Sequence, residues 1–227
     1  MGLTLVATPI GNLGDLSQRA ETALRDADFW LVEDTRVSGK LQAHLGLSKP
    51  MRILNEHTSP RQVETYLEQL QTGKNAALLT DGGTPVISDP GALLIDLSHE
   101  SQVEVDSIPG PSAVTNSLAL SGFYAQRFAF LGFLARKPGP IKEELSAFAD
   151  SPLTLVFFES PHRLCKLLQL AHEVLGERRY AVCREMTKMH QQVWRARLPV
   201  LPSETEVLPK GEISLVIEGK RKSKTAD

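Results

Sequence analysis

The feature that most constrains this chain is the alternation of short β-rich runs with longer amphipathic stretches in its first half. Four runs are predicted strands: residues 3–7, 28–32, 75–80 and 103–108. One helix is predicted to begin at a cap, either Asp15 or Ser17, and to end near Arg25. Another precedes the third strand, because its apolar residues recur at helical spacing: Val63, Tyr66, Leu67 and Leu70. This alternation predicts an α/β fold with a mostly parallel sheet covered by helices.

The second half has a different pattern. Five runs are predicted strands: residues 128–133, 153–158, 180–184, 192–197 and 212–217. One clear helix is predicted over 161–175, with Ser160 as its N-cap and Pro161 as its first residue. Because the last three strands follow one another through short connections, we expect antiparallel pairing and a mixed sheet. We therefore predict two α/β domains, residues 1–115 and 116–219, followed by a disordered basic tail, residues 220–227.

Composition excludes several classes of protein. Hydrophobic residues make up 41% and charged residues 23% of 227 residues, with a formal net charge of −2, so the chain is neither disordered nor highly charged. Two cysteines, with no CxxC pair, argue against a disulfide scaffold and a cysteine zinc site. No apolar run approaches the ~20 residues of a membrane span, and no signal peptide is recognisable at the N-terminus. We expect a cytoplasmic protein without a metal site.

Turn residues gather after two of the predicted strands. Eight of the 30 Gly and Pro residues lie between Asp81 and Ser112. Ligands of open α/β sheets bind outside the carboxyl ends of the strands, so these loops are a candidate binding site, although tight turns alone would also explain them. Neither GxGxxG nor GxxxxGK[ST] occurs in the sequence, which disfavours a dinucleotide or a nucleoside triphosphate. A ligand with an adenosine but no phosphates remains compatible with the pattern.

Charged residues follow three strands and form a second candidate feature. Glu33, Asp34 and Arg36 come directly after the second strand, where they mark either a site or an ion pair with a helix cap. Glu159 with Arg163, and Glu185 with Lys188, are interpreted as scaffolding pairs. Six basic residues of the second half form a candidate positive face for RNA, or else lie on solvated strands: Arg178, Arg179, Arg184, Lys188, Arg195 and Arg197.

Seven motifs in register carry a resemblance to a known family. They are residues 6–15, 33–36, 80–91, 109–113, 158–163, 184–188 and 210–212. From Leu3 to about Gly219 the chain resembles the tetrapyrrole-methylase-like class of S-adenosylmethionine-dependent methyltransferases, and within it the branch that methylates small-subunit ribosomal RNA. The resemblance implies two α/β domains of the tetrapyrrole methylase type with a cofactor cleft between them, a homodimer, and small-subunit ribosomal RNA or the assembled subunit as partner. The implied reaction is 2′-O-methylation of a cytidine ribose in the decoding region.

The motif match also implies which residues bind S-adenosylmethionine. In the first half these are Pro9, Gly11, Asp81, Gly83, Thr84, Val86, Ser112 and Ala113. In the second half they are Phe158, Leu164, Met186, Pro209, Lys210 and Gly211. For catalysis we expect Glu33 or Asp34 to be the base that takes the ribose proton, with Arg36 holding them or a phosphate. Two alternatives stay open: methylation of a small tetrapyrrole or precorrin, and a module that binds S-adenosylmethionine or RNA without turnover.

Overall fold

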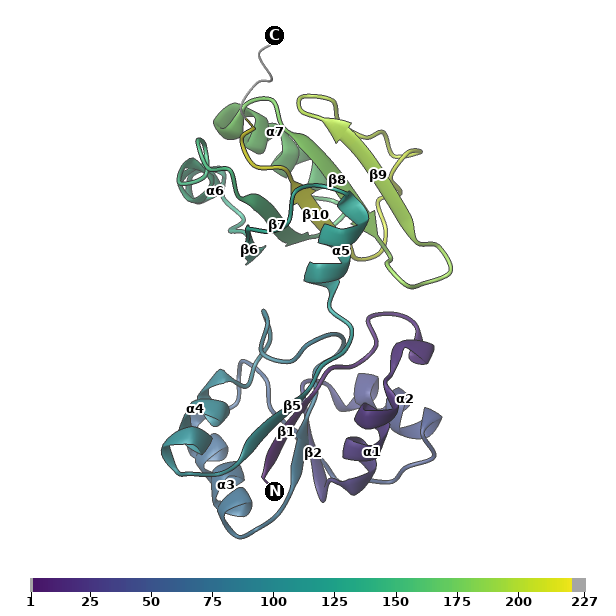
Figure 1. Ribbon diagram of the computed structural model, residues 1–227, viewed down its shortest axis with the longest axis vertical. Helices are drawn as coiled ribbons and strands as arrows, with labels where there is room; N and C mark the ends of the chain where they lie inside the picture. Colours follow the sequence, from purple (N-terminus) through teal and green to yellow (C-terminus); the bar gives the residue numbers. More distant parts are fainter. Residues whose placement is uncertain (1, 222–227) are drawn as a thin grey trace. The chain divides into compact units, whose positions relative to one another are not determined.

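The computed structural model describes residues 2–221, which form two compact units that divide between Ser112 and Ala113. The N-terminal unit has five strands: β1 (Leu3–Val6), β2 (Phe29–Val32), β3 (Met51–Ile53), β4 (Ala76–Leu78) and β5 (Val105–Ile108). Its helices are the 3-10 turn η1 (Leu13–Asp15), α1 (Gln18–Asp26), α2 (Thr35–His44), α3 (Pro60–Gln71) and α4 (Ala92–Glu100). The strands pair in the order β3-β2-β4-β1-β5, all parallel, which confirms the predicted parallel sheet (Figure 1).

Helices cover both faces of this sheet, and the strand β2 is apolar along its whole length because both of its faces are buried. All four residues of β2 are buried. Phe29 and Leu31 point into the core beneath α3 and α4, whereas Trp30 packs in the core beneath α1 and α2. The Trp30 indole N–H donates to the Leu24 carbonyl at 2.9 Å, so its one polar atom is satisfied inside the core. A strand that is buried on both faces reads as an unbroken hydrophobic run.

The C-terminal unit has a mixed sheet. Its strands are β6 (Phe128–Phe133), β7 (Thr154–Glu159), β8 (Arg179–Arg184), β9 (Gln192–Arg197) and β10 (Ile213–Ile217). Its helices are α5 (Ala113–Ser121), α6 (Pro138–Ser146) and α7 (Leu164–Leu175). The order is β6-β7-β10-β8-β9, in which β6 and β7 are parallel and β8 pairs antiparallel with both β9 and β10. The predicted antiparallel pairing of the last strands is therefore confirmed.

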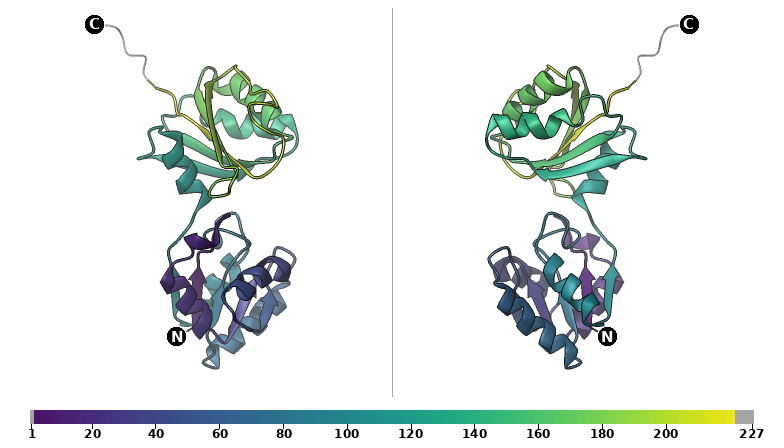
Figure 2. Two further views of the ribbon diagram at one scale, coloured as in Figure 1. Left: turned by 90° about the vertical axis from the view of Figure 1, so that its right-hand side faces the viewer. Right: turned by 90° about the vertical axis from the view of Figure 1, so that its left-hand side faces the viewer.

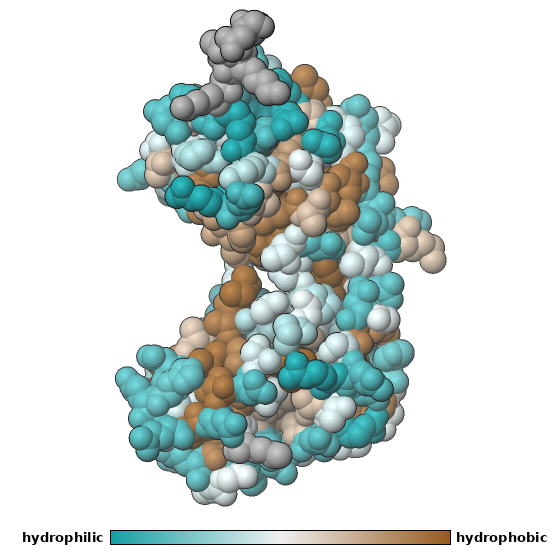
Figure 3. Space-filling view, in the orientation of Figure 1, coloured by the Kyte–Doolittle hydropathy of each residue, from teal (hydrophilic) through white to brown (hydrophobic). Residues whose placement is uncertain are grey.

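Each face of this sheet has its own core. One face packs against α6 and α7 and the other against α5, as the two views of Figure 2 show for this unit. Hydrophilic residues cover much of the visible face of each unit, while hydrophobic residues gather in a few areas (Figure 3). Neither unit contains a helix, among residues 2–221, that is long and apolar enough to cross a membrane.

Two predicted helix starts have different outcomes. Ser17, not Asp15, caps α1, because its side chain accepts a hydrogen bond from the Ala20 amide. The predicted start of α7 at Ser160 and Pro161 is wrong: α7 begins at Leu164. The Glu159 carboxylate accepts the Ser160 amide at 2.7 Å, and the Ser160 carbonyl accepts from the Arg163 amide, so residues 160–163 form a turn before the helix.

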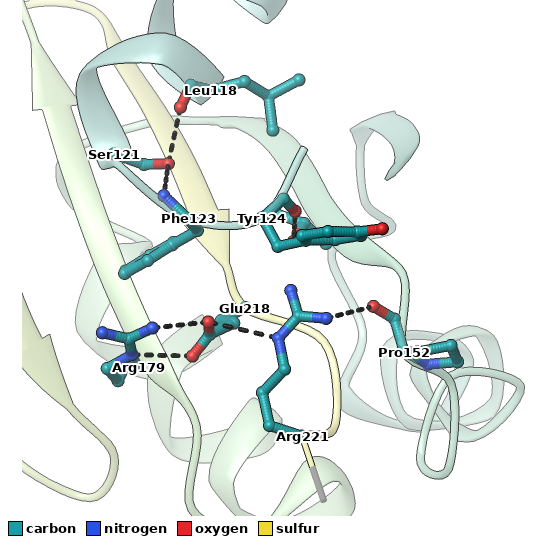
Figure 4. A network of polar contacts seen from close by, with 9 residues as sticks. Leu118, Ser121, Phe123, Tyr124, Pro152, Arg179, Glu218 and Arg221 are labelled. Atoms are coloured by element: carbon teal, nitrogen blue, oxygen red, sulfur yellow. Dashed lines mark hydrogen bonds and ion pairs between the residues drawn. The ribbon is translucent and has the colours of Figure 1, made fainter. Parts of the chain in front are cut away.

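Glu218 links β8 to the end of the described chain (Figure 4). It accepts two hydrogen bonds from the Arg179 guanidinium, at 2.7 and 2.6 Å, and a third from Arg221 at 3.3 Å. The Arg221 guanidinium also lies 4.8 Å from the centroid of the Tyr124 ring. The expected tail therefore begins with residues that have defined partners, since Lys220 also pairs with Asp150. Residues 222–227 of that tail lie outside the described residues.

We expect Glu218→Gln to lower the free energy of unfolding at pH 7. Hydrogen bonds from Arg179 and Arg221 lower the pKa of Glu218 below 4.5, so its stabilisation is present above the unfolded pKa and is lost as pH falls through the folded pKa. The loss should be about 1–2 kcal/mol, because Arg179 is 45% exposed and water screens the pair. Urea unfolding at pH 7 and at pH 3 measures it. An equal loss at both pH values would contradict the assignment.

Candidate cofactor and substrate site

Three loops interlock at the carboxyl end of the N-terminal sheet. The loop after β1 meets the loop after β4 through a two-residue bridge, in which the Thr8 amide donates to the Gly83 carbonyl and the Gly83 amide to the Thr8 carbonyl, each at 2.9 Å. The Thr84 hydroxyl donates to the carbonyl of Pro111, in the loop after β5, at 3.3 Å. The Gly- and Pro-rich segments that are far apart in the sequence are therefore held together at one edge of the sheet.

These loops approach one another closely, and one of them has a backbone conformation that favours glycine. A Cβ on Gly82 would lie 3.2 Å from the Pro9 carbonyl oxygen, and Gly83 has a φ of +95°. Val86 also has a positive φ, +73°, which is unusual for a β-branched residue. Such backbone strain persists only where the surrounding structure fixes it, and it gathers at ligand-binding sites.

Carboxylates from several loops lie near one another beside this edge. Burial raises the pKa of Glu33, and the nearby charges of Asp81, Asp89 and Glu56 raise it further. Burial likewise raises the pKa of Asp81 and of Asp89. Glu33 and Asp34 follow β2 directly, and Asp81 and Asp89 follow β4, its neighbour in the sheet. Glu33 and Asp89 are partly buried and Asp81 is exposed, and the interaction of their charges favours a cationic ligand or a proton-transfer role.

Asp34 and Arg36 differ from Glu33. The Asp34 side chain caps α2 by accepting the Arg36 amide at 2.8 Å, and it accepts further hydrogen bonds from the Arg36 guanidinium. These contacts lower the pKa of Asp34 to about 2. The Asp34 carboxylate is thus ionised and hydrogen-bonded to Arg36, whereas the raised pKa of Glu33 makes the Glu33 carboxylate the more basic of the two.

The structure brings most of the expected cofactor residues of the first half into the interlocked loops. Five of them lie in the loops after β1 and β4: Pro9, Asp81, Gly83, Thr84 and Val86. Gly11 is exposed in the loop that leads to η1. Ser112 ends the N-terminal unit, and Ala113 is the first residue of α5. The sequence did not single out Asp89 and Glu56, which approach Glu33 only because their loops fold back toward β2.

Expected site residues of the second half lie at one edge of the mixed sheet. Ile213 pairs with Glu159 on one side and with Arg184 on the other, so the ends of β7 and β8 and the start of β10 are neighbours. Phe158 lies at this edge, as do the turns that hold Met186 and residues 209–211. The two turns are joined, because the Glu185 carboxylate accepts hydrogen bonds from the Glu212 amide and the Lys188 ammonium, each at 2.9 Å.

Two of these expected residues are buried. Leu164 is only 2% exposed and packs in the core beneath α6 and α7. Met186 is also buried, between Glu185 and Thr187, which both have positive φ. Within this unit both side chains help to shape the edge of the sheet, while Lys210 and Gly211 are exposed.

The other charged residues are mostly paired. Glu159 forms an ion pair with Arg163 at 3.3 Å, and Lys188 contacts both Glu185 and Glu212, as expected of scaffolding pairs. Arg184 is buried and donates to the carbonyls of Lys210 and His190. Of the six basic residues considered for RNA, only Arg195 and Arg197 are exposed with no acidic partner among the described residues. No cluster of three or more potential metal ligands occurs within residues 2–221.

The chain is similar to known proteins over most of its length. Residues 2–202 match the family Tetrapyrrole (Corrin/Porphyrin) Methylases. The chain is 43% identical to a protein of Synechocystis sp. named ribosomal RNA small subunit methyltransferase I, covering 96% of this chain and 78% of that one. It is 41% identical to the protein of the same name from Thermotoga maritima, covering 96% of this chain and 98% of that one.

Solved structures support the fold. The crystal structure of the methyltransferase CobJ matches with a TM-score of 0.70 at 14% identity, covering 98% of this chain and 97% of that one. The crystal structure of diphthine synthase matches with a TM-score of 0.72 at 16% identity, covering 95% and 89%. These identities are too low to indicate a shared substrate. The family match and the sequence relatives show that the chain belongs to the tetrapyrrole methylase family of S-adenosylmethionine-dependent methyltransferases, in its ribosomal RNA small subunit methyltransferase I branch.

Proposed function

We propose that the protein transfers a methyl group from S-adenosylmethionine to the ribose 2′-oxygen of a cytidine in the decoding region of small-subunit ribosomal RNA. The observation that carries the proton-transfer part of the proposal is the position of Glu33, a partly buried carboxylate directly after β2, beside the interlocked loops and near Asp81 and Asp89. Relatives at 39–43% identity named for ribosomal RNA methylation support the substrate class.

The residues of the N-terminal loops fit the cofactor. S-adenosylmethionine is cationic at its sulfur and carries no phosphate, and the side chains around the loops are acids: Glu33, Asp81 and Asp89. The close approach of Gly82 to the Pro9 carbonyl leaves backbone atoms, with no Cβ between them, at the face of the loops. We infer that Pro9, Gly11, Asp81, Gly83, Thr84 and Val86 hold the cofactor in this unit, together with Ser112 and Ala113. From the C-terminal unit we infer Phe158, Leu164, Met186, Pro209, Lys210 and Gly211.

The cofactor supplies an electrophilic methyl group when it is bound. The chain must then align the ribose oxygen with that group, and positioning of this kind contributes roughly 7–11 kcal/mol to lowering a barrier. A ribose hydroxyl is a poor nucleophile until its proton leaves. Glu33 is the proposed base, because its raised pKa makes it a better proton acceptor than Asp34 at neutral pH.

Asp34 and Arg36 have a positioning role in this proposal. Asp34 begins α2 and fixes Arg36, and the Arg36 side chain is 88% exposed. An exposed guanidinium held at one end by a carboxylate is suited to contact a phosphate of the substrate.

The proposed setting is a cytoplasmic homodimer that acts on the small ribosomal subunit or its RNA. A dimer would present two copies of each basic surface to one folded RNA. Sedimentation of the full chain tests the dimer, and full activity of a monomer would contradict it.

The main alternative is methylation of a small tetrapyrrole. Solved structures named cobalt precorrin-4 methyltransferase and uroporphyrin-III-C-methyltransferase resemble this chain at only 18–20% identity, which supports the fold and not the substrate. The second alternative, binding without turnover, is separated by the same assay.

Incubation of the protein with methyl-labelled S-adenosylmethionine tests the substrate class. Three acceptors are compared: small ribosomal subunits, protein-free small-subunit RNA and a porphyrinogen. We expect label in the subunits or the RNA and none in the porphyrinogen. Label in the porphyrinogen alone, or cofactor binding with no label in any acceptor, would contradict the proposal.

A further inference from the structure

Phe133 is an exposed aromatic residue at the end of an edge strand. It is the last residue of β6, which pairs only with β7 among the described strands (Figure 1). Its side chain is 64% exposed, more than any other aromatic residue that the structure describes. Exposed aromatic side chains contribute much of the binding energy at contact surfaces, so this ring is a candidate for contact with a partner.

An irregularity in β6 turns Phe133 outward. Phe130 pairs with Val156 and Phe133 with Phe158, so β6 takes three steps where β7 takes two. The extra residue is accommodated at Gly132, which is buried and has a φ of +58°. Bulges of this kind redirect a side chain and are frequent next to active sites. Here the bulge leaves the Phe133 ring beside Phe158, with centroids 5.6 Å apart, while Phe158 also contacts Phe130.

Basic residues follow Phe133 directly, and the segment that carries them is held in place. Arg136 and Lys137 are exposed and have no acidic partner within the described part of the chain. The Arg163 guanidinium donates to the carbonyls of Leu134 and Ala135, at 3.0 and 2.7 Å, and pairs with the buried Glu159. The backbone between Phe133 and Arg136 is thus fixed to the start of α7.

We propose that Phe133, Arg136 and Lys137 bind an unpaired segment of the substrate RNA, with one base stacked on the Phe133 ring and neighbouring phosphates on the two basic residues. An exposed ring next to cationic side chains matches the chemistry of single-stranded nucleic acid, whose bases stack on aromatic faces and whose backbone is anionic. The ring adjoins Phe158, which the proposed function assigns to the cofactor, so the surface lies beside a residue of the proposed cofactor site within the same unit. The inference rests on that proposed function.

The aromatic part is tested with Phe133→Leu and Phe133→Trp in the full-length protein. The matched control is Phe128→Leu, because Phe128 lies at the other end of the same strand and is also exposed, at 41%. Binding of a short fluorescein-labelled single-stranded oligoribonucleotide and KM for small subunits are measured for each variant. We expect Phe133→Leu to weaken RNA binding about 5–100-fold. Phe133→Trp keeps an aromatic ring and should keep RNA binding, and Phe128→Leu should leave it unchanged.

Three results would overturn the aromatic part. Equal effects of Phe133→Leu and Phe128→Leu would indicate a general loss of structure. A loss of S-adenosylmethionine affinity with unchanged RNA binding would assign the ring to the cofactor. A change in sedimentation alone would assign it to an interface between copies of the chain.

The basic part is tested by the salt dependence of binding. For the double variant Arg136→Gln and Lys137→Gln, the slope of log affinity against log salt for the oligoribonucleotide should fall by about 1.4, two phosphate contacts on single-stranded RNA. The control Lys142→Gln removes a nearby lysine that already pairs with Glu173, and its slope should not change. An unchanged slope in the double variant would contradict the proposal.

The oligonucleotide assay needs no turnover, so it separates failure of this surface from failure of the proposed function. Failure of the proposed function shows as absent methyl transfer by the unmodified protein.

Discussion

Replacing Glu33 by glutamine is expected to lower kcat about 10²–10⁴-fold, the usual contribution of a positioned general base. Cofactor affinity should be nearly unchanged, because glutamine keeps the size of the side chain and an acceptor oxygen. In the unmodified protein kcat should rise with pH as Glu33 ionises, at a pH above its ordinary pKa of 4.5 because burial and neighbouring acids raise that pKa. Single-turnover methyl transfer from pH 4 to 8 measures both effects.

The stability of the Glu33→Gln variant should not fall with its activity. Glu33 has a pKa that is raised in the folded protein, so its charge opposes folding once pH exceeds the unfolded pKa and does so fully above the folded pKa. Glu33→Gln should therefore leave the free energy of unfolding at pH 7 unchanged or raise it. A variant that is inactive but no less stable is what a functional carboxylate predicts, whereas a scaffolding residue would lose stability with activity.

Glu56→Gln is the matched control. Glu56 contributes to the raised pKa of Glu33, but its own side chain is 85% exposed. Removing its charge should keep kcat at neutral pH and move the pH profile toward lower pH. Full activity of Glu33→Gln, or an equal loss in both variants, would contradict the assignment of Glu33 as the base.

Replacing Gly83 by valine is expected to weaken S-adenosylmethionine binding about 10–100-fold. Valine is strained at a φ of +95°, by about 1–3 kcal/mol, and relief of that strain must move the loop that is bridged to Thr8. The loops after β1 and β4 would then separate from the arrangement that the cofactor is proposed to need. Calorimetric titration with the cofactor and urea unfolding, performed on the same preparation, measure affinity and stability separately.

Gly73→Val is the control for backbone strain. Gly73 has a φ of +88°, and an added Cβ there would meet nothing within 4 Å. Both variants should lose comparable stability, but only Gly83→Val should lose cofactor affinity. If the two variants bind the cofactor equally well, the interlocked loops are structural turns and not its binding site.

The sequence predicted the parts of the fold that depend on local pattern. The fully buried β2 and the loops of residues 81–91 could be recognised because apolar runs and turn residues reflect burial and backbone geometry directly. It missed β3, which has three residues and an exposed Ile53, and α4, which begins at Ala92 after Gly91, an N-cap without a side-chain hydrogen bond. Short or uncapped elements are stabilised by packing, and a local pattern does not record packing.

The sequence predicted where the candidate site lies, but not all of the residues that form it or their protonation states. Strand ends identified Glu33, Asp34 and Asp81 as residues to consider. The distinct states of Glu33 and Asp34 could not be foreseen, because they depend on which carboxylate Arg36 engages and on how Asp89 folds back. The same holds for Phe133, which one extra residue in β6 turns outward.

Nucleoside analysis of methylated small ribosomal subunits tests the central claim most directly. Subunits from cells that lack the modification are incubated with the protein and labelled S-adenosylmethionine, and the RNA is digested and separated by mass. The account predicts label in 2′-O-methylcytidine, with little in a parallel reaction with Glu33→Gln. Label on a base, on a different ribose, or absent from RNA while the cofactor binds, would contradict it.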